Sequence, residues 1–376
     1  MYKRNIYLLC AIAFLQGMVF YAPVATLYRQ AVGIGIFEIT LMESISLALS
    51  IVLEIPWGWT ADRIGYRKTM LICCGLFFVS KIVFWKAVTF GGFLLERILL
   101  AVICSGLSGV DTAMLYESCR EENSHRVFGI YEYLQQTGLL LAAAVYSLWV
   151  GTDFRLAGFL TVLSYGGAAL LCLFLQEVKM PEERTVGFRE SVQVLTGQLK
   201  SRKMLFFLMG VALVSETHQC ITVFLNQLQY TRAGMSVEGI SVAYMLISLA
   251  GLFSVCSSRL SGWIGAERLG STAILGTLLC CLVLAVTDNA VISVFAVVCI
   301  RVGYSLLQPL QLEQQNRRID TCHRATALSM NAALMNSASV LLNLLYGSVA
   351  DVSLSASMFL AAGLCLISFL LWRTSW

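Results

Sequence analysis

Long apolar segments separated by short polar breaks recur along the whole of this 376-residue chain. Most of them match the roughly 20 residues that an α-helix needs to cross a bilayer. With the polar and turn-rich breaks as boundaries, the pattern predicts twelve membrane-spanning helices, at residues 5–27, 37–57, 69–88, 92–114, 128–150, 155–176, 204–226, 238–257, 271–287, 290–311, 324–347 and 353–373. The expected fold class is therefore an all-α integral membrane protein.

Composition supports a bilayer environment for this chain. Hydrophobic residues make up 58% and charged residues 13%, whereas an average soluble domain is roughly a quarter charged. A soluble core cannot bury that much apolar surface, so the lipid bilayer is the expected surrounding. The formal net charge of +4 then belongs to the loops and does not indicate a nucleic-acid partner.

Basic residues are distributed unevenly among the polar breaks. If the N-terminus lies inside, most of the 26 Lys and Arg residues fall on cytoplasmic segments. This positive-inside bias predicts that both termini are cytoplasmic. We therefore expect a multi-pass protein of the cell membrane.

The longest polar stretch, residues 178–203, divides the spans into two groups of six. The expected organisation is an N-terminal six-helix bundle (1–177), a cytoplasmic inter-bundle loop (178–203) and a C-terminal six-helix bundle (204–376). Within the loop, Phe188, Val192, Leu195 and Leu199 share one helical face, which favours a helix lying on the membrane surface. A solvated linker explains these residues equally well.

Four features recur, in the same order, at a spacing of about 200 residues. They are Tyr28, Gly33 and Glu38 with Tyr230, Gly234 and Glu238; Asp62–Gly65 with Glu267–Gly270; Arg97 with Arg301; and His125–Arg126 with His323–Arg324. Four ordered matches indicate duplication of a six-helix unit. The expected geometry is two parallel repeats related by a pseudo-two-fold axis along the membrane normal, with a solute site between them.

The turn after the second span carries the most specific motif of the chain. It reads Gly58, Trp59, Thr60, Ala61, Asp62, Arg63, Ile64, Gly65, Tyr66, Arg67, Lys68. In residues and position it resembles the loop signature GxxxDRxGxRK of the major facilitator superfamily. Gly58 permits close helix approach, Gly65 permits a tight turn, and Asp62 is suited to meet a helix N-terminus or a basic side chain.

The resemblance implies a conformational gate made of Gly58, Asp62, Arg63, Gly65, Arg67 and Lys68. In this family such residues lock the cytoplasmic side until the two halves rock. The alternative is that the basic residues only anchor this end of the helices at the cytoplasmic surface.

Further residues resemble drug-exporting branches of the same family. Glu54, Ile55 and Pro56 lead into the motif as they do in those exporters. The Gly-Pro pair of the antiporter signature is missing from the fifth span, which offers only Gly129, Gly138 and an alanine run. That absence weighs against proton-coupled export while leaving transport itself unaffected.

The resemblance therefore implies a secondary transporter that works by alternating access. The predicted function is export of a small amphipathic solute or drug coupled to protons or another ion. Uptake of a small nutrient by symport is the alternative, followed by a non-transporting receptor. No Walker A, HExxH or GxSxG pattern occurs, so we expect no ATP use, no enzyme activity, no cofactor and no metal. A monomer is expected.

Ionisable residues within spans are costly and need a partner or a function. Glu43, Lys81, Glu96 and Arg97 lie near the outer ends of their spans. We expect a structural ion pair between Lys81 and Glu96, which face each other across a short hairpin. Arg97 resembles the arginine that the family associates with proton coupling, with Glu43 as its candidate partner.

Three more ionisable residues lie about half way across their spans: Glu216, His218 and Arg301. In one interpretation Glu216 or His218 carries a proton, because burial and a near-neutral imidazole both suit proton exchange. In the other, Glu216 pairs statically with Arg301 and His218 bonds to the backbone.

Uncharged polar residues inside the spans are candidates for lining a solute cavity. They are Gln16, Tyr21, Gln135, Gln136, Asn336 and Asn343. Hydrogen bonds between helices explain such residues equally well. Pro23 and Pro309 are expected to bend their helices.

Overall fold

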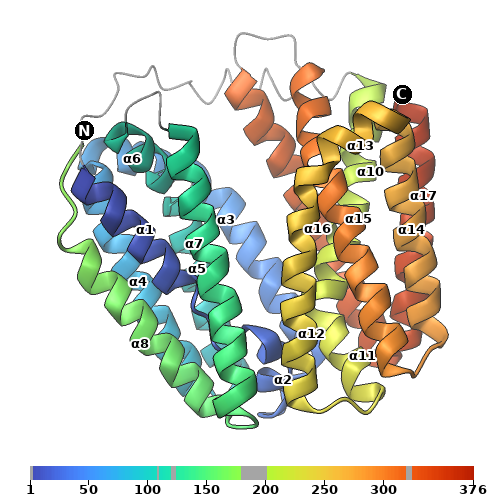
Figure 1. Ribbon diagram of the computed structural model, residues 1–376, viewed down its shortest axis with the longest axis horizontal. Helices are drawn as coiled ribbons and strands as arrows, with labels where there is room; N and C mark the ends of the chain where they lie inside the picture. Colours follow the sequence, from blue (N-terminus) through green and yellow to red (C-terminus); the bar gives the residue numbers. More distant parts are fainter. Residues whose placement is uncertain (1–2, 108–109, 120–123, 179–200, 319–323) are drawn as a thin grey trace. The chain divides into compact units, whose positions relative to one another are not determined.

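The computed structural model describes residues 3–107, 110–119, 124–178, 201–318 and 324–376 (Figure 1). Side chains are described for all of these except residues 54–55, 58–63, 112, 124–126, 316, 324–327 and 329–330. The described secondary structure is helical throughout, without a β-strand. The all-α fold class is therefore confirmed.

Each predicted span coincides with one helix or with a run of consecutive helical segments. In the first half these are α1 (Lys3–Gly17) with η1 (Ala22–Val24) and α2 (Ala25–Gln30), α3 (Ile36–Ile64), α4 (Tyr66–Lys86), α5 (Phe90–Leu107) with α6 (Val110–Ser118), α7 (Ser124–Val145) with η3 (Tyr146–Val150), and α8 (Phe154–Cys172). In the second half they are α10 (Arg202–Gln219) with η4 (Cys220–Leu225) and α11 (Asn226–Arg232), α12 (Val237–Ala250) with η5 (Gly251–Cys256) and α13 (Ser257–Ile264), α14 (Ala266–Val286), α15 (Ala290–Arg317), α16 (Arg324–Val352) and α17 (Leu354–Ser375).

Eleven of the described helices are long and apolar enough to cross a membrane. The remaining predicted span is α7 with the π-helical η3, which carries Glu132, Gln135 and Gln136 among its apolar residues. The prediction of a twelve-helix membrane fold is consistent with this arrangement.

The chain forms two compact units. Unit 1 combines Met1–Ile34, Ile45–Glu183 and Val237–Met245, and unit 2 combines Gly35–Ser44, Arg184–Ser236 and Leu246–Trp376. Each unit thus includes the first turns of a helix, α3 or α12, whose remainder belongs to the other unit. Residues 179–200, which contain most of the predicted inter-bundle loop and its surface helix, lie outside the described residues, so the predicted domain boundaries stay a prediction.

In unit 1, α1 crosses α7 at two glycines. A Cβ atom on Gly17 would collide with the Gln135 carbonyl oxygen, and one on Gly138 would collide with the Phe14 carbonyl oxygen. The two backbones therefore touch directly, as small residues allow between membrane helices. Gly138 of the fifth span thus has a packing role that its sequence context did not reveal.

Gly138→Ala is expected to destabilise unit 1, because backbone atoms on α1 cannot move away as a flexible side chain would. Overpacking typically costs about 1–3 kcal/mol. Gly129→Ala on the same helix is the matched control, since nothing lies within 4 Å of its added methyl group. Thermal unfolding of the detergent-purified protein should show a lower midpoint for Gly138→Ala alone. Equal midpoints for the two variants would contradict this packing account.

The first span is broken between α1 and η1, and α8 satisfies the backbone groups that the break exposes. Ser164 Oγ donates to the Leu15 carbonyl (2.6 Å), and Tyr165 OH donates to the Gln16 carbonyl (2.8 Å). The Phe20 N–H donates to Thr161 Oγ1 (3.0 Å). A non-helical backbone at membrane depth needs such partners. Pro23 lies in η1 at the end of this break, whereas Pro309 lies within the continuous α15.

Unit 2 has an apolar core where α10, α14 and α17 meet. Trp372 is fully buried there, and its indole Nε1 donates to the Glu267 carbonyl (3.1 Å). Gly270 faces this indole so closely that a Cβ atom would overlap it. Gly270 is therefore a packing residue inside α14.

This position corrects the predicted repeat register. Gly65 and Gly265 have nearly equal positive φ values, 91° and 86°, and each caps the N-terminus of the following helix. Both helices, α4 and α14, then run for 21 residues. Gly265, not Gly270, is therefore the counterpart of Gly65, and the predicted match of Asp62–Gly65 with Glu267–Gly270 is wrong. A positive φ is a physical reason for glycine at both positions. Similarity of the neighbouring side chains can arise by chance.

In the corrected register Glu267 is the counterpart of Arg67 and carries the opposite charge. In unit 1 the backbone N–H of Arg67 donates to Glu177 Oε1 (3.1 Å). In unit 2 Glu267 Oε1 pairs with Arg373 Nη1 (2.7 Å). A carboxylate thus accepts a hydrogen bond in both repeats, but it comes from the segment after α8 in one and from α14 in the other.

The two arginines of the repeat also differ in depth. Arg97 lies seven residues after Phe90, where α5 begins, and Arg301 lies eleven residues after Ala290, where α15 begins. Four residues correspond to about one helical turn, or about 6 Å. Arg301 is therefore one turn deeper in its helix than Arg97.

Candidate functional site

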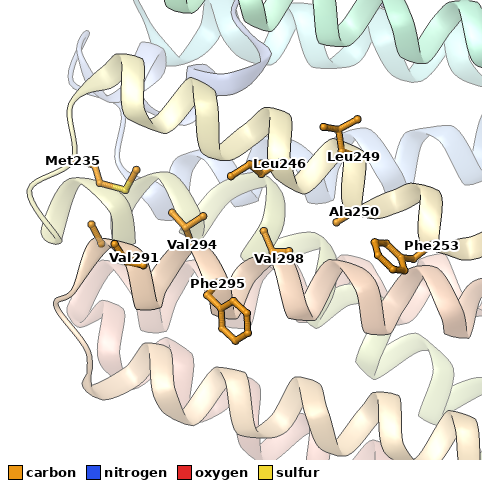
Figure 2. Close-up of a pocket in the computed structure, with 10 residues that line it drawn as sticks. Met235, Leu246, Leu249, Ala250, Phe253, Val291, Val294, Phe295 and Val298 are labelled. Carbon is orange, nitrogen blue, oxygen red and sulfur yellow. The ribbon is translucent and has the colours of Figure 1, made fainter.

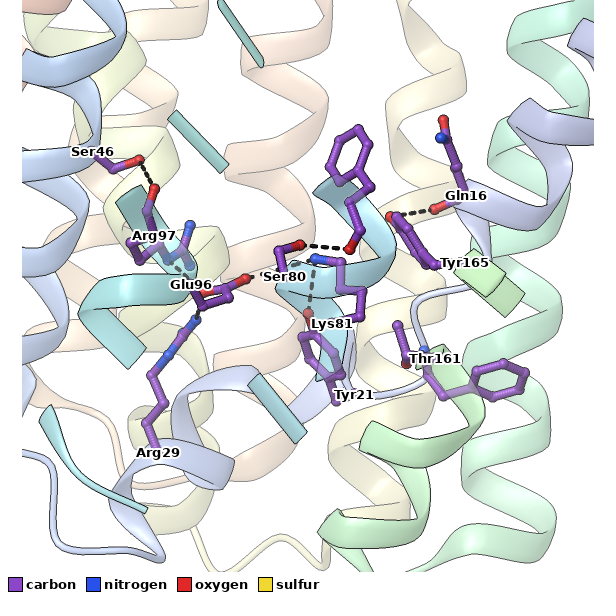
Figure 3. A network of polar contacts seen from close by, with 12 residues as sticks. Gln16, Tyr21, Arg29, Ser46, Ser80, Lys81, Glu96, Arg97, Thr161 and Tyr165 are labelled. Carbon is purple, nitrogen blue, oxygen red and sulfur yellow. Dashed lines mark hydrogen bonds and ion pairs between the residues drawn. The ribbon is translucent and has the colours of Figure 1, made fainter. Parts of the chain in front are cut away.

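A buried cluster of charges occupies unit 1, centred on Glu96 of α5 (Figure 3). Three cations surround this carboxylate: Arg29 Nη2 at 3.9 Å, Lys81 Nζ at 3.7 Å and Arg97 Nε at 3.7 Å. The Glu96 side chain is only 2% exposed. The predicted Lys81–Glu96 ion pair is thus confirmed.

Aromatic side chains complete the surroundings of these cations. Lys81 Nζ donates to Tyr21 OH (3.1 Å) and lies 5.0 Å from the centroid of Tyr165. The guanidinium of Arg29 lies 5.3 Å from the centroid of Phe84, where cation–π attraction stabilises it. Tyr21, a predicted cavity residue, is therefore held inside a packed cluster. The arrangement is that of a structural core.

Arg97 differs from the other two cations because its side chain is 20% exposed. Ser46 Oγ donates to its carbonyl (3.0 Å), which fixes the backbone at this point. Its predicted partner Glu43 belongs to unit 2. The proton-coupling role of this pair stays a prediction.

In unit 2, His218 of α10 stacks on Tyr304 of α15. The ring centroids are 4.0 Å apart with an interplanar angle of 13°, and Tyr304 OH lies 2.9 Å from Ser215 Oγ. Arg301 Nη1 lies 3.4 Å from His218 Nε2. A guanidinium can only donate, so Nε2 accepts and the proton of the neutral imidazole resides on Nδ1.

Glu216 lies two residues before His218 on α10 and has different neighbours. Cys220 Sγ is 3.4 Å from both Glu216 Oε1 and Asn343 Oδ1, and Ser339 is a further hydrogen-bonding group beside the carboxyl. Glu216 is 5% exposed. The predicted Glu216–Arg301 pair is not formed among these described residues, because Arg301 turns to His218 instead.

The other predicted cavity residues have different local surroundings. Gln16 Nε2 donates to Cys74 Sγ (3.5 Å), which is a contact between helices of unit 1. Asn343 is fully buried, whereas Gln135 and Asn336 are exposed and Gln136 is half-buried. Their common role as a cavity lining stays a prediction.

Only part of the predicted gate can be placed. Gly65 is the positive-φ residue before α4, and Arg67 Nη2 donates to the Leu173 carbonyl (3.4 Å). Lys68 is exposed. The side chains of Gly58, Asp62 and Arg63 lie outside the described residues, as do those of His125 and Arg126.

An apolar groove of about 560 Å³ follows α12, η5 and α15 on unit 2 (Figure 2). Its lining includes Leu246, Leu249, Phe253, Val291 and Phe295, all of which are exposed. Exposed apolar side chains on a membrane-spanning helix suit contact with lipid. The groove therefore does not fit a polar solute.

Comparison with known families decides what these helices belong to. The sequence profile of the Major Facilitator Superfamily matches residues 6–342. The chain belongs to the Major Facilitator Superfamily. It is accordingly a multi-pass membrane transporter of small molecules, and the resemblance carried by residues 58–68 is confirmed. No curated protein sequence matches the chain.

Solved structures of this superfamily share the fold. A point mutant of the nucleoside transporter NupG has a TM-score of 0.86 at 13% identity, covering 99% of this chain and 100% of that one. A bacterial homologue of the human lysosomal transporter Spinster gives 0.75 at 14% identity, with 100% and 98% coverage. A POT family transporter in complex with 5-aminolevulinic acid gives 0.76 at 15% identity, with 98% and 95% coverage.

Sequence reasoning did not place Tyr304 and Cys220 in the unit 2 cluster. By sequence alone Tyr304 is one bulky aromatic residue of a span among several, and Cys220 is one of many apolar cysteines. Tyr304 follows Arg301 by three positions and therefore shares its helix face. That spacing was the available signal for a joint site, whereas the contact of Cys220 with Asn343 required the packing of α10 on α16.

Proposed function

We propose that this transporter couples the movement of a small polar organic solute to protons, and that Glu216 is the proton-binding group. One observation carries the proposal. Within the described part of the chain, the groups that act most strongly on the buried Glu216 carboxyl are uncharged hydrogen-bonding side chains and the like charge of Glu43. Burying an ionised carboxylate without a cation costs free energy. Glu216 should therefore bind a proton when it is shielded from water and release it when water reaches it.

His218 is the weaker candidate for proton binding. Its Nε2 faces the Arg301 guanidinium, so a protonated imidazole would place two cations in contact and remove the acceptor that this ring offers to Arg301. Its ring is also fixed by stacking on Tyr304. His218 and Arg301 therefore serve the solute rather than the proton.

A polar solute suits the side chains of this cluster better than an apolar drug does. Arg301, Tyr304 and Ser215 offer charged and hydroxyl hydrogen-bonding groups on α15 and α10. Several fold neighbours are described as transporters of nucleosides or bind 5-aminolevulinic acid. Such solutes combine a ring or chain with many hydrogen-bonding atoms.

Two directions of transport have support from different observations. Residues 54–68 resemble exporters, which favours antiport of solute against protons. The polar character of the Ser215–His218 segment favours a hydrophilic nutrient, and therefore symport into the cell. We place both termini in the cytoplasm of a plasma-membrane protein, with Asp62 and its neighbours as the cytoplasmic gate during alternating access.

Flux into proteoliposomes under an imposed pH gradient tests the proposal. The panel should contain nucleosides, dipeptides, 5-aminolevulinic acid and a hydrophobic cationic dye. Symport predicts that the accepted solute accumulates when the outside is acidic, and antiport predicts accumulation when the inside is acidic. Equal flux with and without the gradient for every bound solute would overturn the proton coupling.

A further inference from the structure

The eighth span is interrupted at mid-length by the 3₁₀ segment η5, Gly251–Cys256. Its counterpart in the first repeat, α3, is α-helical without interruption from Ile36 to Ile64. Short 3₁₀ stretches inside helices often mark functional positions. This difference between the repeats therefore needs a local cause.

Helix α15 fastens η5 at both ends. Ser305 Oγ contacts the Ala250 carbonyl (3.4 Å), immediately before the segment. Ser257 Oγ, immediately after it, donates to the Leu306 carbonyl (2.6 Å). Ser305 follows Arg301 by one turn, so both residues lie on the same face of α15.

Gly251 lies directly against the Arg301 guanidinium. A Cβ atom on Gly251 would lie 2.7 Å from Arg301 Nη2, 3.2 Å from Nε and 3.3 Å from Cζ. These distances are shorter than van der Waals contact. The guanidinium can occupy its present position, with Nη1 at His218, only because residue 251 has no side chain.

Phe253 of η5 lines the apolar groove and is 52% exposed (Figure 2). In the first repeat Arg97 is one turn shallower and pairs with Glu96 instead. The deeper arginine, the glycine and the 3₁₀ segment therefore occur together in one repeat only, within the described residues.

We propose that Gly251 is a positioning residue, which seats Arg301 so that its guanidinium holds His218 in the Nδ1–H tautomer and faces the solute. The solute-facing part rests on the proposed function, whereas the seating of Arg301 does not. Because the clashing atoms end a flexible side chain, a methyl group at position 251 displaces the guanidinium and leaves the helices in place.

Nitrogen NMR of ¹⁵N-histidine-labelled protein tests the seating without any transport assay. The chain has three histidines, and comparison with His218→Gln identifies the His218 signals. In the native protein Nε2 should resonate as a hydrogen-bonded acceptor and Nδ1 as the protonated nitrogen. Gly251→Ala should shift Nε2 toward a free imidazole or mix the two tautomers.

Gly276→Ala is the matched control, because nothing lies within 4 Å of a methyl group at this position in neighbouring α14. Unchanged His218 signals in Gly251→Ala, or the same shift in Gly276→Ala, would overturn the seating. If the NMR shift appears but no solute shows proton-coupled flux, the seating stands and the proposed function fails.

A double-mutant cycle tests whether the seating serves solute binding. Gly251→Ala should raise the KM of the accepted solute about tenfold, which is the order expected for losing a hydrogen bond to a charged group. In an Arg301→Gln background the same change should have little further effect, because residues in one network are not additive. A full additional tenfold loss in that background would show that Gly251 acts independently of Arg301.

Discussion

Glu96→Gln is expected to lower the free energy of unfolding of this transporter by about 3–5 kcal/mol. Glu96 lies between Arg29, Lys81 and Arg97 at 3.7–3.9 Å and is almost completely buried. A glutamine keeps the shape of the side chain but removes its charge. Three cations then remain near one another in a medium that solvates them poorly, which is the costly way to break a buried ion pair.

Equilibrium unfolding of the detergent-purified protein, followed by tryptophan fluorescence, measures this loss. Glu132→Gln is the matched control, because Glu132 is an exposed carboxylate on α7 of the same unit. It should unfold like the native protein. If Glu96→Gln were as stable as this control, the cluster could not be the structural core of unit 1, and its charges would need a functional explanation.

Glu216→Gln is expected to abolish solute accumulation driven by a pH gradient while leaving solute exchange intact. The glutamine amide preserves hydrogen bonding with Cys220 and Asn343, which lie around the carboxyl, but it cannot release a proton. Conformational exchange of the loaded transporter requires no net proton movement. Coupling should therefore be lost without loss of folding or of solute binding.

Proteoliposomes measure both activities in one preparation, with imposed-gradient accumulation as one assay and counterflow of labelled solute as the other. Glu313→Gln is the control, since Glu313 is an exposed carboxylate of unit 2 that pairs with Arg317. It should retain both activities. Gradient-driven accumulation by Glu216→Gln at the native level would rule out Glu216 as the proton-binding group, and Arg97 with Glu43 would then become the first alternative.

Local chemistry shows why these two carboxyls differ although the sequence presents both as glutamates within spans. Glu96 follows a hairpin that brings Lys81 opposite it, so its pairing could be predicted from the order of residues. The neighbours of Glu216 could not be predicted in this way, because Arg301 is 85 positions away in the chain and the direction of its side chain is set by tertiary packing. The predicted static pair is not formed because the Arg301 guanidinium lies at His218 Nε2 instead.

The repeat illustrates the same limit. Matching of residue types aligned Gly65 with Gly270, five positions from the true counterpart Gly265. Gly265 immediately precedes α14 and Gly270 lies in its second turn, and residue type does not distinguish them. Only the positive φ at Gly265 and the Trp372 indole against Gly270 distinguish a turn glycine from a packing glycine. The backbone conformation, which cannot be read directly from the sequence, therefore identifies the true counterpart of Gly65.

The sequence by itself determined the membrane class, the positions of the spans, the family motif and the Lys81–Glu96 pair. These properties depend on composition, on helix length against bilayer thickness, and on neighbours close in the chain. Tertiary structure alone decided that Gly17 and Gly138 form a helix crossing, that Arg301 faces His218, and that Cys220 and Asn343 lie around Glu216. Such contacts join residues far apart in the chain, and their outcome depends on packing at the scale of a single methyl group.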